Sequence, residues 1–197
     1  MRYPARPLLP DHTIWHAADT AAAFAGASRG GSAPALLQFH MGPVQAYIEA
    51  ARPLRDLWTG SAILLWVTFE AMRPILESVG PAAFTSPSLR GNPMVDRWLR
   101  SKVGGCLQKL IDEPDEKALK QPSLPNVFTA LVPAEEGEAL AAEVERSLRV
   151  GWKGLADDVK ESLQKEFGEI YSGWSRNWDA QIESYFEVRT AVVPVCH

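Results

Sequence analysis

Cysteine, histidine and long apolar runs are scarce in this chain. It has two cysteines, Cys106 and Cys196, and four histidines among 197 residues. Two thiols make neither a disulfide scaffold nor, without other ligands, a zinc site. The longest apolar stretch, 62–67, is far below the roughly 18 residues of a membrane span, and the amino-terminal residues carry no apolar signal region. The sequence therefore predicts a cytoplasmic globular protein that makes no membrane contact.

A strong excess of charge of either sign is also lacking. Lys and Arg number 20 against 24 Asp and Glu, so the formal net charge is −4 and the pI is about 5.6. A domain that binds nucleic acid through its own electrostatic field is usually basic. Any RNA contact is therefore expected to be local or shared with partner chains. The hydrophobic share, 46%, is ordinary for a globular domain with its own core.

The chain does carry clear signals of domain organisation. Residues 1–34 are proline-rich coil, a helix candidate over 14–25 and a linker over 26–34 that is rich in Gly and Ser. Such a linker predicts a flexible joint. Residues 35–197 predict one domain, with an inserted loop region at about 87–125 that contains one helix candidate over 93–111.

A short apolar strand, 36–41, opens this domain. Alternating side chains give it two unlike faces. One face comprises Leu37, Phe39 and Met41, and the other comprises Leu36, Gln38 and His40. Gly42 permits the turn that follows. Pro43 suits the first position of the next helix, because its missing N–H would have no partner there.

Amphipathic helices follow the strand. Helical spacing of apolar residues over 44–51 and 58–79 predicts two segments that Pro53 separates. Another long helix begins near residue 134, and Gly151 with Gly154 predicts a bend in it. Its apolar face comprises Leu140, Val144, Leu148, Trp152, Leu155, Val159, Leu163, Phe167 and Ile170.

Further strands are expected over 82–86, 127–132 and 185–193, the last of them after a helix over 174–184. The order is then β-α-β-β-α-β, which is the ferredoxin-like split pattern. The predicted fold class is α+β. It comprises a four-stranded antiparallel sheet with long helices on one face, plus a short amino-terminal helical segment.

The run 36–61, LLQFHMGPVQAYIEAARPLRDLWTGS, contains a polar string that ordinary core helices do not need. The residues that interrupt its apolar positions are Arg52, Arg55, Asp56 and Ser61. An Arg–Asp pair would hold such a cluster in place. The cluster either borders a binding site or is a polar network that only fixes the two helices.

Two other positions could face a ligand. The turn from Gly42 to Gln45 presents N–H groups at a helix N-terminus, which suits an anion such as phosphate. A plain strand-to-helix turn is the alternative. Asn126, at the mouth of the third strand, is either a turn-forming amide or a contact to the polar cluster or to a nucleotide.

Five stretches, in this order, resemble one protein family. Besides 36–61 they are Pro-Asp-His-Thr-Ile-Trp at 10–15, Ser-Leu-Arg-Gly-Asn-Pro at 88–93, Ser-Leu-Pro-Asn-Val-Phe at 123–128, and the end from 178 to 194. They resemble the first palm-like domain of the large subunit of type III-B CRISPR effector complexes, the Cmr complexes.

This resemblance implies a role. In the family, the whole subunit joins ATP into cyclic oligoadenylates when its complex captures target RNA. A second palm would supply the Gly-Gly-Asp-Asp metal site and its Mg²⁺, while this palm would form one wall of the ATP cleft. The implied partners are the remainder of the large subunit, other Cmr subunits and, indirectly, crRNA and target RNA.

The residues expected to line that cleft are Gly42, Pro43, Gln45, Arg52, Arg55, Asp56, Ser61 and Asn126. ATP would bind weakly, and within the assembled subunit. The alternative is a purely structural interaction module without nucleotide binding.

Palm-type catalysis is not expected from this chain alone. A working palm holds two metals with carboxylates at the end of its first strand and in the hairpin between its next two strands. Here the first strand ends in Phe39-His40-Met41, and Gly-Gly-Asp-Asp is absent. Asp157-Asp158 is an acidic doublet on a helix, where neighbouring side chains diverge by about 100°. It is expected to be a solvated surface.

An HD-type metal hydrolase is the other enzymatic possibility. Asp11-His12 and His16 resemble the last segment of such a domain. Imidazole and carboxylate are suitable ligands for its metals, but four histidines are too few. Residues 1–34 are therefore interpreted as a remnant of that domain, with no catalytic or metal-binding residue expected in the chain.

Overall fold

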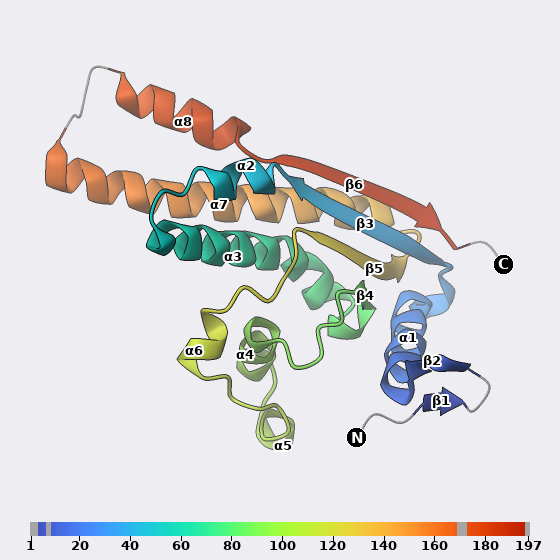
Figure 1. The fold of residues 1–197 in the computed structure, drawn as a ribbon. Helices are drawn as coiled ribbons and strands as arrows, with labels where there is room; N and C mark the ends of the chain where they lie inside the picture. Colours follow the sequence, from blue (N-terminus) through green and yellow to red (C-terminus); the bar gives the residue numbers. More distant parts are fainter. Residues whose placement is uncertain (1–3, 7–8, 169–172, 196–197) are drawn as a thin grey trace.

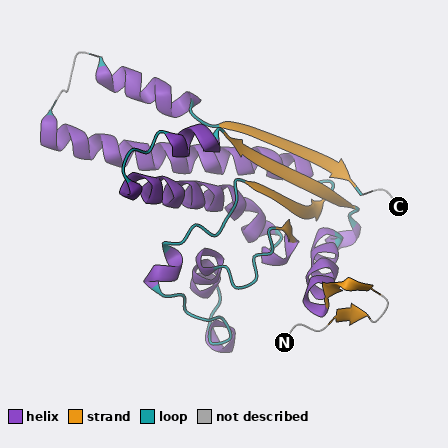
Figure 2. Cartoon of the chain, viewed as in Figure 1, coloured by secondary structure: helices purple, strands orange, loops and turns teal. Residues whose placement is uncertain are grey.

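The computed structural model describes residues 4–6, 9–168 and 173–195, with 4–6 and 9–12 described as backbone only. A four-stranded antiparallel sheet with the order β4-β5-β3-β6 lies at the centre of the fold (Figures 1 and 2). Its strands are β3 (Pro34–Gly42), β4 (Phe84–Ser86), β5 (Val127–Pro133) and β6 (Glu187–Pro194). With helices after the first and third of these, the chain has the predicted β-α-β-β-α-β order, and the α+β class is confirmed.

Long helices cover one face of this sheet (Figure 1). They are α3 (Leu54–Ser78) and α7 (Gly137–Phe167), while α2 (Val44–Glu49) precedes α3 and α8 (Trp174–Ser184) follows α7. Phe39 of β3 stacks on Phe128 of β5 under these helices, with ring centroids 4.5 Å apart. The prediction that the strand has two unlike faces is confirmed, because Leu37, Phe39 and Met41, which share one face, are fully buried.

The other face of the sheet, which we call the open face, is largely exposed. It comprises Leu36, Gln38 and His40 of β3, Val127, Thr129 and Leu131 of β5, and Glu187, Arg189, Ala191 and Val193 of β6. Among the residues that the structure describes, α1 (Ile14–Ala27) covers part of this face, where Ala23 and Ala27 pack against Leu131. The prediction that Leu36, Gln38 and His40 face away from the helices is confirmed.

The helices differ from the sequence prediction at their ends. Pro43 is the N-cap of α2, not its first residue, and Pro53 is the N-cap of α3. α7 runs through Gly151 and Gly154 as one helix, and Figure 1 shows no bend there. At Gly151 the backbone instead comes close to α3, since a Cβ at this position would lie 3.0 Å from Cγ of Glu70.

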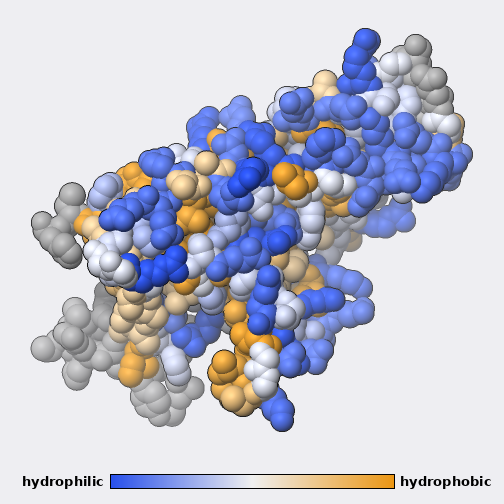
Figure 3. Space-filling view, turned by 180° about the vertical axis from the view of Figure 1, so that it is seen from behind, coloured by the Kyte–Doolittle hydropathy of each residue, from blue (hydrophilic) through white to orange (hydrophobic). Residues whose placement is uncertain are grey.

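The apolar face of α7 is buried only in its first half. Leu140, Val144 and Leu148 are buried against the sheet and α3, whereas Val159 is 43% and Phe167 62% exposed. The helix extends past the end of the sheet together with α8 (Figure 1). Seen from behind, this extension is covered mostly by hydrophilic side chains (Figure 3).

The amino-terminal segment is more ordered than predicted. Strands β1 (Pro4–Arg6) and β2 (Leu9–Thr13) form a two-stranded antiparallel pair where coil was expected. The segment expected to be a flexible joint contains a 3-10 turn, Arg29–Gly31. Arg29 donates to the carbonyl of Ser78 and forms a 3.2 Å ion pair with Glu136. The joint is therefore fastened to the end of α3 and to the residue before α7.

The insertion between β4 and β5 holds three helices where one was predicted. They are α4 (Pro93–Lys102), α5 (Gly105–Gln108) and α6 (Glu116–Leu119), and a 3-10 turn, Pro81–Ala83, precedes β4. Val103 and Gly104 are extended and interrupt the helix that the sequence predicted over 93–111. Leu107 and Leu110 of this region are 56% and 79% exposed. Figure 3 shows hydrophobic side chains at the lower end of the molecule.

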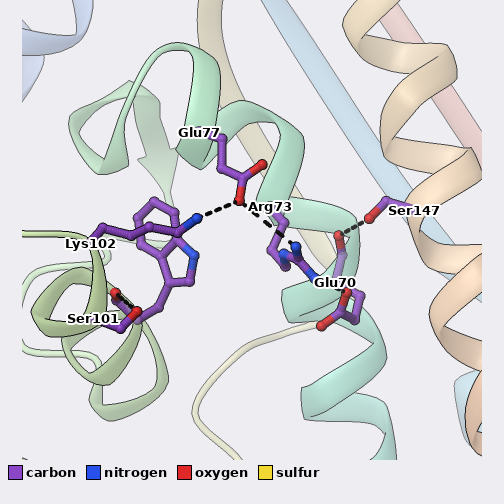
Figure 4. A network of polar contacts seen from close by, with 7 residues as sticks. Glu70, Arg73, Glu77, Ser101, Lys102 and Ser147 are labelled. Atoms are coloured by element: carbon purple, nitrogen blue, oxygen red, sulfur yellow. Dashed lines mark hydrogen bonds and ion pairs between the residues drawn. The ribbon is translucent and has the colours of Figure 1, made fainter.

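A polar network fastens this insertion to the helical layer (Figure 4). Lys102 of α4 pairs with Glu77 of α3 at 3.2 Å, and Arg73 pairs with Glu70 at 2.8 Å. Ser147 of α7 donates to the carbonyl of Glu70 at 2.8 Å. The chain of contacts joins α4, α3 and α7, so the insertion is positioned relative to the core.

Candidate functional site

An open depression of about 710 Å³ lies where β3 ends. Its lining residues are His40, Met41, Gly42, Pro43, Val44, Gln45, Ile48, Glu49 and Asn126. They come together because β3 and β5 are neighbours in the sheet and α2 begins directly after β3. The depression unites four of the eight predicted site residues, namely Gly42, Pro43, Gln45 and Asn126.

Asn126 fixes the rim of this depression through the main chain of Met41. The Met41 N–H donates to the Asn126 carbonyl at 3.0 Å, and the Asn126 side-chain amide Nδ2 donates back to the Met41 carbonyl at 2.8 Å. The β3–β5 ladder is thereby extended one residue beyond Val127. The amide oxygen Oδ1 makes no hydrogen bond to a described residue.

The depression is lined mainly by apolar groups and carries one carboxylate, that of Glu49. Met41 is fully buried, and Val44 and Ile48 are partly buried against the core. Gln45 donates its Nε2 to Oε1 of Glu49 at 2.9 Å. Neither Lys nor Arg is among the lining residues. The depression therefore suits an apolar or aromatic group with a hydrogen-bonding edge better than it suits a phosphate.

The predicted polar cluster is not formed. Arg52, Arg55 and Asp56 are exposed, and none makes a side-chain hydrogen bond or ion pair with a described residue. The reason is Pro53, which caps α3 and leaves Arg52 outside the helix, so that Arg52 and Asp56 do not share a helical face. Ser61 donates to the carbonyl four residues earlier in its own helix, at 2.9 Å. None of these four residues lines the depression.

A second hollow, which sequence reasoning missed, lies between α7 and α8. It has a volume of about 350 Å³, and we call it the α7–α8 groove. Its lining residues are Leu148, Arg149, Val150, Trp152, Lys153, Asp179, Ile182, Glu183 and Phe186. Trp152 and Leu148 belong to the predicted apolar face of α7, but only the packing of α8 could show that this face borders a cavity.

Another hollow, of about 440 Å³, contains Asp19, Arg90, Asp96 and Asp112 among its lining residues. Arg90 pairs with Asp19 and lies over the Trp15 ring, 4.9 Å from its centroid. These contacts fasten α1 to the loop before α4. Partial burial raises the pKa of Asp96, and the nearby charge of Asp112 raises it further.

The described residues contain no group of three or more His, Cys, Asp or Glu that could hold a metal ion. Asp157 of the acidic doublet forms an exposed ion pair with Lys153 at 2.8 Å. The side chains of Asp11 and His12 lie outside the described part of the chain, and His16 contacts Thr13. No helix in that part is both long and apolar enough to cross a membrane.

Comparison with known proteins agrees with this fold. Residues 36–157, more than half of the chain, match the family described as CRISPR-associated protein Cmr2, N-terminal. The chain belongs to the Cmr2 N-terminal family. The Cmr2 subunit of the CRISPR Cmr system of Pyrococcus furiosus is 30% identical to it over 146 residues. That match covers 74% of this chain and 15% of the Pyrococcus protein.

A solved structure, the type III-B Cmr-beta complex bound to cognate target RNA, contains a chain with the same fold. The match has a TM-score of 0.65, covers 94% of this Cmr2-family chain and 22% of the other, and has 18% sequence identity. The resemblance to the large Cmr subunit that the sequence predicted is thereby confirmed. The chain spans only a small part of the length of both relatives.

Proposed function

We propose that this chain is the non-catalytic palm of a Cmr2-type large subunit, where it forms one wall of an ATP-binding cleft. The observation that carries this proposal is the depression at the end of β3. Its partly exposed apolar residues, Val44 and Ile48, suit an adenine ring, and the free oxygen of Asn126 can accept a hydrogen bond from a base or a ribose. The cleft would serve RNA-guided antiviral defence, as the family resemblance implies.

This wall would hold only part of the nucleotide. The lining residues include Glu49 and lack Lys and Arg, so the triphosphate would lie away from the depression. The second palm would bind the phosphates and Mg²⁺ and would carry out the chemistry. Binding of ATP to the isolated chain should therefore be weak, with a Kd near or above about 1 mM, or about −4 kcal/mol.

The open face is proposed to contact the remainder of the subunit. Leu36 is 37%, Val127 36% and Val193 58% exposed on it, and apolar side chains on a sheet face favour a docked partner over water. Other Cmr subunits would contact the domain as well. The net charge of −4 supports indirect contact with crRNA and target RNA through those partners.

A charge placed in the depression tests the nucleotide role. Gln45 is exposed, so Gln45→Glu should lower the melting temperature only slightly, although it replaces a hydrogen bond by a second carboxylate beside Glu49. In the assembled subunit we expect ATP affinity and oligoadenylate synthesis to fall several-fold. Gln164→Glu, the same change on the exposed part of α7, is the matched control. Unchanged ATP affinity in the Gln45 variant would refute the cleft proposal.

The structural interaction module is the second candidate, and the exposed apolar residues of the open face favour it. Leu36→Asp and Val193→Asp, each in this chain, should weaken its association with a separately produced second-palm half in light-scattering measurements. If they do so while Gln45→Glu leaves ATP binding intact, the module alone is supported. A chain with no affinity for that half would contradict the docking role of the open face.

A further inference from the structure

The outer edge of β6 pairs with no strand of the described chain. The Val195 N–H donates to the Pro34 carbonyl at 2.9 Å, so Val195 directs its main-chain N–H and C=O groups toward β3. These directions alternate along an antiparallel strand. Val188, Thr190 and Val192 therefore direct their N–H and C=O groups outward.

The opposite side of β3 gives the same register. The Met41 N–H donates to the Asn126 carbonyl, and the Ala134 N–H donates to the Ala33 carbonyl. The odd-numbered residues of β3 therefore make their main-chain hydrogen bonds to β5. The even-numbered residues of β3 are left for β6 and pair with its odd-numbered residues. The hydrogen bonds on both edges of β3 thus agree that the even-numbered residues of β6 direct their main-chain N–H and C=O groups away from the sheet.

This edge lacks the usual protection against pairing. β6 is eight residues long, and its register with β3 shows no bulge. Its charged residues are Glu187 and Arg189, which pair with each other at 3.2 Å, and it has no Lys and no Pro before Pro194. Natural edge strands are normally shortened, bulged, charged or covered, because an exposed ladder is a template for another chain. A long regular edge is therefore a plausible docking element.

The α7–α8 groove lies where this edge begins. Phe186, which lines the groove, directly precedes β6, and no residue of β3 lines it. Trp152 donates its Nε1 to the carbonyl of Ile182 at 3.0 Å, and its ring centroid lies 5.1 Å from that of Phe186. These contacts fix an apolar floor with room for a large side chain.

We propose that β6 and the α7–α8 groove bind an extended segment of a partner protein. The segment adds antiparallel to β6 and inserts an apolar side chain, near its carboxyl end, into the groove. In strand addition, main-chain hydrogen bonds give affinity, and a pocket for a side chain gives specificity. This role is independent of nucleotide binding at the end of β3.

The rim of the groove specifies the charge of the segment. Lys153 is paired with Asp157 at 2.8 Å, and Arg149 with Glu145 at 2.7 Å. Glu183, exposed on α8, makes no ion pair with a described residue, although its charge also acts on Lys153. A basic residue next to the apolar anchor of the segment would complete this rim.

A second copy of the chain fits less well. Antiparallel pairing of two β6 strands about Thr190 would place Val195 of one copy opposite Tyr185 of the other. Val195 packs against Ala23 and Leu131 of its own chain and cannot fill the groove. Self-pairing would therefore use the edge and leave the groove empty.

The test joins a probe segment to the full chain. A strand of alternating Thr and Val that ends in Leu-Lys is fused after His197 through a flexible Gly-Ser linker, which raises its effective concentration. Amide hydrogen exchange, followed by NMR, is then compared with and without the fusion. We expect Val188, Thr190 and Val192 to exchange at least about tenfold more slowly, because their N–H groups gain partners. Arg189 and Ala191 already bond to β3 and should not change.

Matched variants separate the edge from the groove. Thr190→Pro removes an outward N–H without breaking a bond to β3 and should abolish the new protection, whereas Thr190→Ala should preserve it. Replacing the Leu of the probe by Ser, or changing Glu183 to Lys, should reduce protection several-fold. Protection of Arg189 and Ala191 reports that each variant is folded.

Three results would overturn the proposal. Unchanged exchange at Val188, Thr190 and Val192 in the fusion protein would exclude strand addition at this edge. Protection that is equal for the Leu and Ser probes would exclude the groove as the specificity pocket. Protection that appears without any probe and rises with protein concentration would assign the edge to a second copy.

Discussion

Asn126 and Met41 bond to each other twice, although 85 positions separate them in the sequence. The Met41 N–H donates to the main chain of Asn126, and the Asn126 side-chain amide donates to the Met41 carbonyl. The sequence left open whether Asn126 forms a turn or contacts a ligand. Its Nδ2 is used to fix the strand end, which leaves Oδ1 as the group available to a nucleotide.

Asn126→Ala should therefore destabilise the fold. Without the amide, the buried Met41 carbonyl loses its donor, at a cost of about 1–3 kcal/mol in the free energy of unfolding. Asn126→Asp should cost at least as much, because a carboxylate oxygen would face the carbonyl oxygen. Urea unfolding of both variants measures these losses. Gln45→Ala, at the exposed rim of the same depression, is the control and should leave the unfolding midpoint unchanged.

The core was predictable from sequence, because its signal is local and periodic. Leu37, Phe39 and Met41 alternate in one strand, and this alternation alone assigns them to the covered face. The predicted face of α7 was correct for Leu148, which is buried, but not for Phe167. Periodicity gives the orientation of a helix, whereas the length of the sheet beneath it decides how far the helix is buried.

The predicted site failed where it depended on contacts between elements. The sequence spacing of Arg52 and Asp56 is that of an ion pair in a helix, but Pro53 starts a new helix between them. The α7–α8 groove escaped prediction because its walls come from two helices whose separation no spacing rule gives. The β1–β2 pair was missed because two of its eight residues, Pro4 and Pro10, are proline, which normally argues against a ladder.

Lys160 should be important for the position of α8. Its ammonium group, with 15% of the side chain exposed, bonds to both carboxylate oxygens of Asp179 at 2.7 and 2.8 Å. Lys160→Met should cost about 1 kcal/mol, since Asp179 is half exposed and can be hydrated after the loss. Hydrogen exchange in α8 should accelerate at the same time.

The control for this change is Lys153→Met. Lys153 pairs with Asp157 on the exposed surface of α7, and such pairs contribute little to stability. Its unfolding midpoint should stay that of the parent chain. Equal losses in the free energy of unfolding for the Lys160 and Lys153 variants would contradict the role assigned to the Lys160–Asp179 contact.

Two glycines of α7 should respond oppositely to the same substitution. A Cβ at Gly137 would lie 2.6 Å from Cγ1 of Val192, whereas a Cβ at Gly154 would meet nothing within 4 Å. Gly137→Ala should therefore destabilise by about 1–3 kcal/mol through overpacking against β6. Gly154→Ala should stabilise by about 0.5–1 kcal/mol through helix propensity. Thermal unfolding of the two variants distinguishes them, and a shift of the same sign in both would contradict this packing.

Asp96 should make the stability of the chain fall as the pH rises. Burial, and then the charge of Asp112, raise the pKa of Asp96 above the ordinary value of about 3.9. Between the ordinary and the raised pKa, the native state keeps a proton that the unfolded state has released. Unfolding then releases a proton, so the free energy of unfolding decreases with rising pH across this window and stays lower above it.

Asp96→Asn removes this titration, but it also removes a carboxylate from the first turn of α4, where a negative charge is favourable. The prediction therefore concerns the difference between variant and parent, not the absolute stability of either. That difference should move in favour of the variant as the pH is raised from below the ordinary Asp pKa to neutrality. Asp112→Asn should produce a smaller change of the same sign, because it removes only the second cause of the shift. Urea unfolding of the three proteins across this pH range measures the trend, and parallel stability curves would show that Asp96 titrates alike in the folded and unfolded chain.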